Sequence, residues 1–157
     1  MEYEFIKWLH ILSATLLFGT GLGSAFYKWA ADRSGNLQAI VHTNKVVVNA
    51  DWIFTTPTVV IQPITGVWLT YVQGIPLSEP WVMLTLLLYA VAGGCWIPVV
   101  WLQIRMRDMA MDSLNKNADL SNTYHRYTQR WFWLGMPAFT SMIIIYFLMV
   151  YKPAIGA

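Results

Sequence analysis

Residues 81–103 read WVMLTLLLYAVAGGCWIPVVWLQ, a run of 23 residues without a charged side chain. A helix that crosses the hydrocarbon core of a bilayer needs about 20 predominantly apolar residues. A run of this length and composition is typical of a membrane-spanning helix. We therefore expect an integral membrane protein, and three further stretches support this interpretation.

These stretches have a similar length and hydropathy and cover residues 5–29, 52–73 and 131–151. Each of the four begins near an aromatic residue, as expected where a helix meets the membrane–water interface. The connections at 30–51 and 104–130 are long and polar, and the first could hold a short amphipathic helix. We predict an all-α integral membrane four-helix bundle, formed by residues 1–157 as a single transmembrane domain with long cytoplasmic loops.

The composition excludes most other classes of protein. Of the 157 residues, 11% are charged and 57% are hydrophobic, whereas soluble domains carry about 25% charged residues. So few charges cannot coat a soluble enzyme, and a formal net charge of +2 offers little to a nucleic acid. The single cysteine, Cys95, excludes an internal disulfide bond and a cysteine-based metal cluster.

Basic residues are distributed unevenly over the two ends of the predicted bundle. Eight of the ten Lys and Arg residues lie in or beside the two long connections, and only Lys7 and Lys152 lie at the other end. Basic residues accumulate on the cytoplasmic side of membrane proteins. We therefore expect both termini outside, which for the inner membrane of a bacterium is the periplasm.

The first predicted helix has a face of small and polar residues. His10 and Ser13 begin this face, whereas Trp8 and Phe26 lie on the opposite one. His10 is therefore expected to point into the bundle, about 7 Å below the outer surface. The same helix carries Gly19-xxx-Gly23, a spacing that allows close contact between helices.

Hydroxyl and amide side chains form a stripe along the second predicted helix. Its members are Asp51, Thr55, Thr58, Gln62, Thr65, Gly66 and Gln73. Polar groups that face lipid are costly, so the stripe is expected to face the bundle. It could line a ligand pocket, or it could form hydrogen bonds between helices.

A histidine inside a membrane segment indicates a functional site, although a hydrogen bond to Gln or Thr of another helix would explain it equally. Lys7 lies one helical turn above His10, nearer the outer surface. This arrangement suits haem b, because an imidazole can ligate the iron while the Lys7 ammonium group meets a propionate. Lys7 alone could simply extend to water.

The sequence does not identify the second axial ligand of the iron. His42 and His125 lie near the cytoplasmic connections, so a clamp of two histidines within one chain is not expected. Met83, Met149, Lys152 or the His10 of a second subunit could ligate the iron, or the position could be empty.

Three short motifs resemble those of HemJ-type membrane proteins. FIKWLH at 5–10 resembles their first-helix signature, in which a lysine precedes a histidine by three positions. TGVWL at 65–69 resembles the glycine-containing end of their second helix, and YKP at 151–153 the Lys-Pro that closes their fourth. CopD-like copper-resistance domains look similar in architecture. The chain is also similar to a family of predicted bacterial integral membrane proteins without an assigned function.

The HemJ-type family contains protoporphyrinogen oxidases that bind haem b. The resemblance implies that His10 is the haem ligand, that Lys7 and Lys152 flank it at the outer surface, and that Gly66 makes room for the porphyrin.

Three positions depart from the HemJ-type pattern. Thr85 stands where the family has a basic residue, Gly94-Cys95 where it has a histidine, and Leu134-Gly135-Met136 where it has Asn-Glu. The loss of an acid and a base argues against the same oxidase chemistry, and it leaves haem binding intact as a hypothesis.

The leading interpretation is a haem b-binding membrane protein that acts in electron transfer, haem handling or redox sensing. One haem near one face cannot carry electrons across about 30 Å of hydrocarbon, so a quinone or a redox protein is an expected partner. The alternatives are a protoporphyrinogen oxidase-like enzyme and a non-enzymatic accessory subunit, in which His10 and Gln62 only join helices. A metal-ion permease is a weaker alternative because intramembrane carboxylates are missing. Since four short helices enclose a haem poorly, we expect a homodimer.

Overall fold

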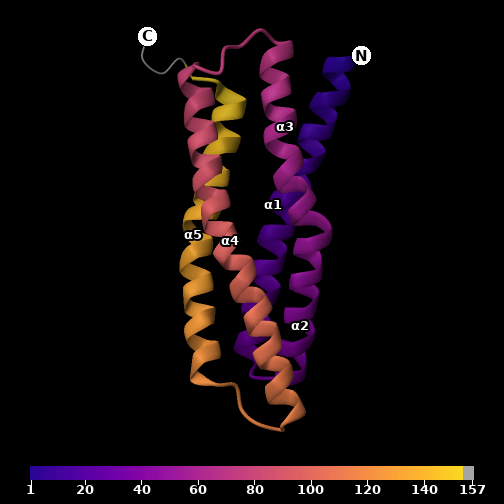
Figure 1. Cartoon of the computed structure of the whole chain (residues 1–157), viewed down its shortest axis with the longest axis vertical. Helices are drawn as coiled ribbons and strands as arrows, with labels where there is room; N and C mark the ends of the chain where they lie inside the picture. Colours follow the sequence, from indigo (N-terminus) through magenta and orange to yellow (C-terminus); the bar gives the residue numbers. More distant parts are fainter. Residues whose placement is uncertain (154–157) are drawn as a thin grey trace.

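The computed structural model describes residues 1–153, and its elements are helices. They are α1 (Glu2–Ser34), α2 (Leu37–Ala50), the short π-helix η1 (Asp51–Thr55), α3 (Thr56–Val72), α4 (Pro80–Asn115) and α5 (Asn122–Tyr151). Because α2, η1 and α3 follow one another without a break, they form one column, and the described chain has four (Figure 1). α1 begins and α5 ends at the same end of the bundle (Figure 1).

Local capping residues reverse the chain within a few positions. Gly35 ends α1 in the left-handed region, with φ at 66°, a conformation that costs glycine little. The next residue, Asn36, caps α2 by accepting hydrogen bonds from the N–H groups of Gln38 and Ala39 at 3.0 and 3.2 Å. Ser121 caps α5 in the same way, accepting from the Tyr124 N–H at 3.2 Å.

The amphipathic helix considered for residues 30–51 is present as α2, whereas the prediction that both connections form long loops is wrong. The predicted spans lie in the four columns, but the helices continue through most of residues 30–51 and 104–130. These polar stretches stay helical because each buries one apolar face, as Ile40 and Met106 show with exposed fractions of 3% and 0%. The drop in hydropathy marks the end of the apolar stretch and not the end of the helix.

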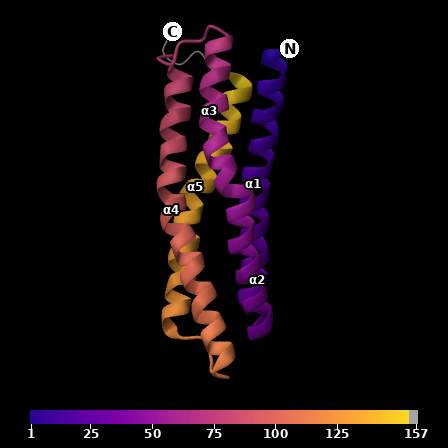
Figure 2. The same cartoon turned by 45° about the vertical axis from the view of Figure 1, so that its right-hand side comes forward.

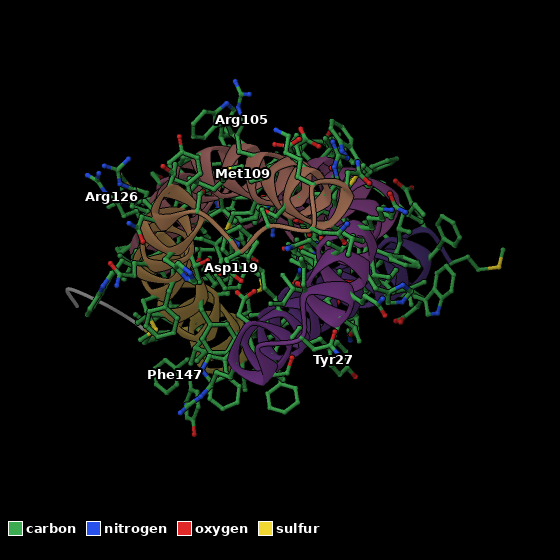
Figure 3. All side chains as sticks on the ribbon, turned by 90° about the horizontal axis from the view of Figure 1, so that it is seen from below. Tyr27, Arg105, Met109, Asp119, Arg126 and Phe147 are labelled. Carbon is green, nitrogen blue, oxygen red and sulfur yellow. The ribbon has the colours of Figure 1, made fainter. Side chains whose placement is uncertain are left out.

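The outer surface of the bundle is apolar along much of its length. Of the described helices, α1, α4 and α5 are long and apolar enough to cross a membrane. Large apolar side chains project outward, among them Ile97 and Trp133, which are 67% and 71% exposed, and soluble proteins rarely expose so many. In Figure 3 Tyr27 and Phe147 point away from the helices. These features agree with a helical bundle in a lipid bilayer.

The four columns pack as two pairs. α4 runs along α5, and α1 packs against α2 and α3, as Figure 1 and Figure 2 show from two sides. Between the pairs, the main contact joins α2 to α4. The largest apolar cluster comprises Ala31, Ile40, Val41, Leu102, Met106, Ala110, Tyr124 and Trp131. This core lies at the end of the bundle where α1 meets α2, and the structure also has two cavities, one of them bordered by Trp131 of the core.

Candidate functional site

His10 points from α1 toward α3 and is 8% exposed. Its Nδ1 atom lies 2.7 Å from the Thr65 hydroxyl oxygen. That hydroxyl group also lies 2.8 Å from the Ile61 carbonyl oxygen, to which it can donate its single hydrogen. With this hydrogen donated to Ile61, the hydroxyl oxygen can accept a hydrogen bond from Nδ1–H, and in that tautomer the Nε2 lone pair is free.

Gln62 fixes the backbone of α1 at the same level. Its amide nitrogen donates to the His10 carbonyl oxygen at 2.8 Å and to the Ser13 hydroxyl oxygen at 2.9 Å. Next to it, Gly66 lies so close to His10 that an added Cβ would be 3.3 Å from the imidazole Cε1 atom. The space above Gly66 is therefore taken by His10 itself.

A cavity of about 430 Å³ opens beside His10, within the range typical of small-molecule and cofactor sites. Its lining comes from α1, α3, α4 and α5 and includes Lys7, His10, Gly66 and Lys152. The four residues predicted for the site thus meet at one cavity. Of the two methionines considered as ligands, Met149 lines this cavity and Met83 does not.

The two lysines are exposed residues of the lining. Lys152 donates a hydrogen bond to the Gln73 side-chain oxygen at 3.3 Å, and its ammonium group lies 5.9 Å from the centre of the Trp81 ring. The Lys7 ammonium group lies 5.4 Å from the centre of the Tyr3 ring. Within residues 1–153 neither lysine forms an ion pair, so both can meet an acidic group of a ligand.

The donors in this cavity do not suit a bare metal ion. Within the described part of the chain, no three His, Cys, Asp or Glu side chains gather as a metal site. The residues that line the cavity include no carboxylate. A single imidazole with a free nitrogen instead suits a group that brings most of its own metal ligands.

The polar stripe of the second column faces inward from Asp51 to Thr65, as predicted, whereas Gln73 at its end is exposed. Thr58, Gln62 and Thr65 are 4%, 6% and 4% exposed, and Asp51 and Thr55 are buried to the same degree. One part of the stripe forms hydrogen bonds between helices, and another part lines a cavity. Gln62 and Thr65 form hydrogen bonds to α1, whereas Asp51 and Thr55 line the second cavity.

Sequence reasoning missed a buried charge. Lys28, which counts among the cytoplasmic basic residues, is 1% exposed. It pairs with Asp32 at 2.8 Å and donates to the Tyr124 hydroxyl oxygen at 3.1 Å. That hydroxyl group donates to Asp32 at 2.6 Å and accepts from Asn44 at 3.0 Å. Only the spacing of Lys28 and Asp32, four residues apart on one helix, signals this network in the sequence.

A family model described as "Predicted integral membrane protein (DUF2269)" matches residues 4–153. The chain belongs to this family. The match includes all four helical columns and Lys7, His10, Gly66 and Lys152. No curated protein and no solved structure matches the chain. Membership in a family of integral membrane proteins of unknown function is thus confirmed, whereas the HemJ-type and CopD-like resemblance stays a prediction.

Proposed function

We propose that this member of the DUF2269 family binds haem b in the membrane, with His10 as axial ligand. The observation that carries the proposal is the environment of the imidazole. The Nδ1 atom of His10 lies 2.7 Å from the Thr65 hydroxyl oxygen. Its Nε2 atom has no hydrogen-bond partner among the described residues, and the imidazole lines a cavity of about 430 Å³. Histidines that ligate metals commonly have their other nitrogen hydrogen-bonded in this manner.

The other site residues fit the same group. Lys7 and Lys152 supply two cations that would pair with the propionates, and Gly66 lets the imidazole lie against α3. Haem at this site would supply one-electron chemistry. The residues of the chain would bind it, set the tautomer of His10 and keep water away from the iron.

The proposed role is electron transfer, haem handling or redox sensing in the inner membrane of a bacterium. Both termini would be periplasmic, and the partners would be a quinone or a redox protein. A homodimer would enclose the haem further. Gly19 offers a face for it, because an added Cβ there would meet nothing of its own chain within 4 Å.

An oxidase reaction fits the cavity less well. Thr85, which stands where HemJ-type proteins have a basic residue, is 9% exposed and donates to the Trp81 carbonyl oxygen at 2.8 Å. With no carboxylate in the lining, general acid–base catalysis would have few groups to use.

A structural role is the second candidate, and the interhelical bonds of His10 and Gln62 favour it. An accessory subunit would use these bonds to hold α1 against α3. It would not need the cavity beside Nε2.

Absorption spectra distinguish the candidates. We expect the protein, purified in mild detergent and titrated with haem b, to show a Soret band and reduced α and β bands. His10→Ala should lose them, whereas His42→Ala, which alters an exposed histidine of α2, should keep them. If the spectrum of the added haem stays that of free haem in detergent although the protein is folded, haem binding is refuted. A marked loss of thermal stability in His10→Ala without any haem signal would support the structural role.

A further inference from the structure

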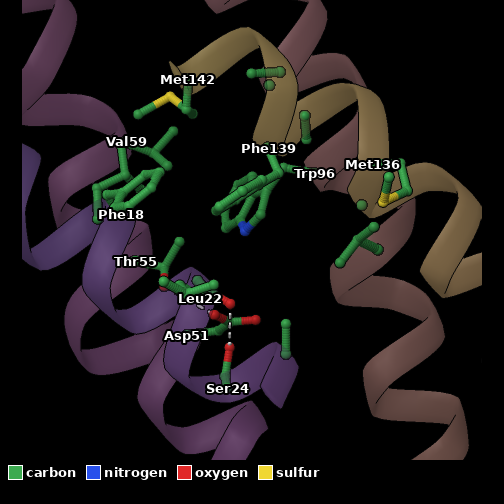
Figure 4. A pocket seen from close by; sticks show the side chains of 18 of the residues that line it. Phe18, Leu22, Ser24, Asp51, Thr55, Val59, Trp96, Met136, Phe139 and Met142 are labelled. Atoms are coloured by element: carbon green, nitrogen blue, oxygen red, sulfur yellow. Dashed lines mark hydrogen bonds between the residues drawn. The ribbon is translucent and has the colours of Figure 1, made fainter. Parts of the chain in front are cut away.

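A second cavity of about 310 Å³ lies between η1 and helices α1, α4 and α5. Its walls are mainly apolar and aromatic, and the Phe18 ring of α1 stacks on the Phe139 ring of α5 with the ring centroids 5.1 Å apart (Figure 4). Gly93 contributes a bare stretch of backbone, because an added Cβ there would meet nothing within 4 Å. The cavity therefore offers room for a flat ring.

Three buried polar atoms around this cavity lack hydrogen-bond partners. They are the indole nitrogens of Trp96 and Trp131 and the side-chain oxygen of Gln103, and no other buried side-chain polar atom of residues 1–153 is unpaired. Gln103 and Trp131 are only 4% and 8% exposed. Unpaired polar atoms are costly away from water and rare in folded proteins. Their convergence on one cavity points to a ligand that pairs with them.

A carboxyl group lies at the same cavity. Asp51 is 5% exposed and accepts a hydrogen bond from the Thr55 hydroxyl group at 2.8 Å. Asp51 also lies within hydrogen-bonding reach of the Gln103 side chain, and it has no ion-pair partner among the described residues. In Figure 4 the indole nitrogen of Trp96 is on the side of its ring where Asp51 and Thr55 lie.

These groups define the chemistry of the ligand. Two N–H donors match carbonyl oxygens, and the Gln103 oxygen with the Asp51 carboxyl group matches hydroxyl groups. An acyl chain would leave all of them unpaired, and an anion would meet Asp51. We propose that this cavity binds the headgroup of a lipid-soluble quinone, as quinone through Trp96 and Trp131 and as quinol through Gln103 and Asp51.

The quinone site and the haem site are separable. Tyr89 and Met142 line both cavities, so the two cavities are neighbours. The role of a bound quinone as electron partner rests on the function proposed above, whereas its binding needs only this cavity. His10→Ala should therefore lose haem and still bind quinone.

Calorimetric titration of the full-length protein in detergent tests the proposal. The probes are menadione, its anaerobic reduced form menadiol, and 2-methylnaphthalene, which has the same rings without oxygen. We expect saturable binding of menadione at least about tenfold tighter than that of 2-methylnaphthalene. Equal affinities would overturn the proposal in favour of an apolar occupant such as an acyl chain.

Three variants assign the contacts. Trp96→Phe should weaken menadione binding about fivefold, and Gln103→Leu should weaken menadiol binding by a similar factor. Trp133→Phe alters a tryptophan that is 71% exposed and outside the cavity, so it should change neither. Unchanged binding of 2-methylnaphthalene shows that each variant keeps the cavity. If Trp96→Phe and Gln103→Leu bind all three probes like the wild type, the assignment is wrong.

Discussion

At the scale of single residues, the hydrogen bond between His10 and Thr65 decides what the imidazole can do. The Thr65 hydroxyl group can donate to the backbone of its own helix and accept from Nδ1–H, and in that tautomer of His10 the Nε2 lone pair is free. The sequence predicts the depth of His10 and its inward direction from helical spacing alone. It cannot identify Thr65 as the partner, because the two residues are 55 positions apart and meet only through the packing of α1 on α3.

Thr65→Val removes the acceptor for Nδ1 and keeps the shape of the side chain. We expect the affinity for haem b to fall by about tenfold, since loss of such an outer partner typically weakens metal binding by 10–100-fold. Haem titration followed at the Soret band measures this. Thr70→Val is the matched control, because Thr70 lines the same cavity and bonds only its own helix. Equal losses in the two variants would contradict the role of Thr65.

Gly66→Ala places a methyl group 3.3 Å from the His10 ring. Alanine at an open helical position would stabilise by up to about 1 kcal/mol, so a lower melting temperature together with weaker haem binding would reveal the close contact. Gly94→Ala is the control, since nothing lies within 4 Å of its added Cβ. Thermal unfolding monitored by circular dichroism should separate the two variants. Stabilisation by Gly66→Ala would show that the contact does not matter.

At the scale of the elements, hydropathy predicts the four columns, but the helices are longer than the apolar stretches that predict them. A membrane span can be recognised from its composition, whereas the continuation of α4 to Asn115 depends on apolar positions such as Met106 and Ala110 that become buried against other helices. The π-helix is invisible in the hydropathy pattern. It lies just before Pro57, and the Thr56 hydroxyl group donates to the Asp51 carbonyl oxygen at 2.9 Å. This irregular turn presents Asp51 and Thr55 to the second cavity.

Lys28→Met tests the network that joins α1, α2 and α5. Removal of one partner of a buried ion pair leaves the other charge unpaired, and we expect a loss of about 3 kcal/mol in stability. Lys116→Met is the control, because the Lys116–Asp112 pair has the same spacing but its lysine is 66% exposed. Addition of Asp32→Asn to Lys28→Met should recover part of the loss. Thermal unfolding that does not change in Lys28→Met would contradict the importance of this network.

At the scale of the whole molecule, the apolar core lies apart from the His10 cavity and borders the second cavity, which Trp131 of the core helps to line. The apolar cluster around Met106 and the Lys28 network join the columns at one end. Both cavities are lined by residues of both helix pairs. This division is consistent with a protein that anchors its helices at one end and binds ligands along the rest. Composition alone predicts that the protein lies in a membrane, but it does not predict where the core and the cavities lie.

Topology can be tested with reporters. The charge distribution predicts both termini in the periplasm. A reporter enzyme that is active only in the periplasm should be active when fused after Ala157 and inactive when inserted between Asn117 and Ala118, in the connection between α4 and α5. The opposite pattern would invert the bundle and place the His10 cavity on the cytoplasmic side.

The haem b content of the purified protein tests the central proposal most directly. It is measured as pyridine haemochrome per polypeptide for the wild type, His10→Ala and His42→Ala, each expressed with an excess of haem precursor. We predict haem in a fixed ratio to the chain in the wild type and in His42→Ala, and its loss in His10→Ala. As much haem in His10→Ala as in the wild type, or none in a folded wild-type protein, would contradict the assignment of His10 as the axial ligand.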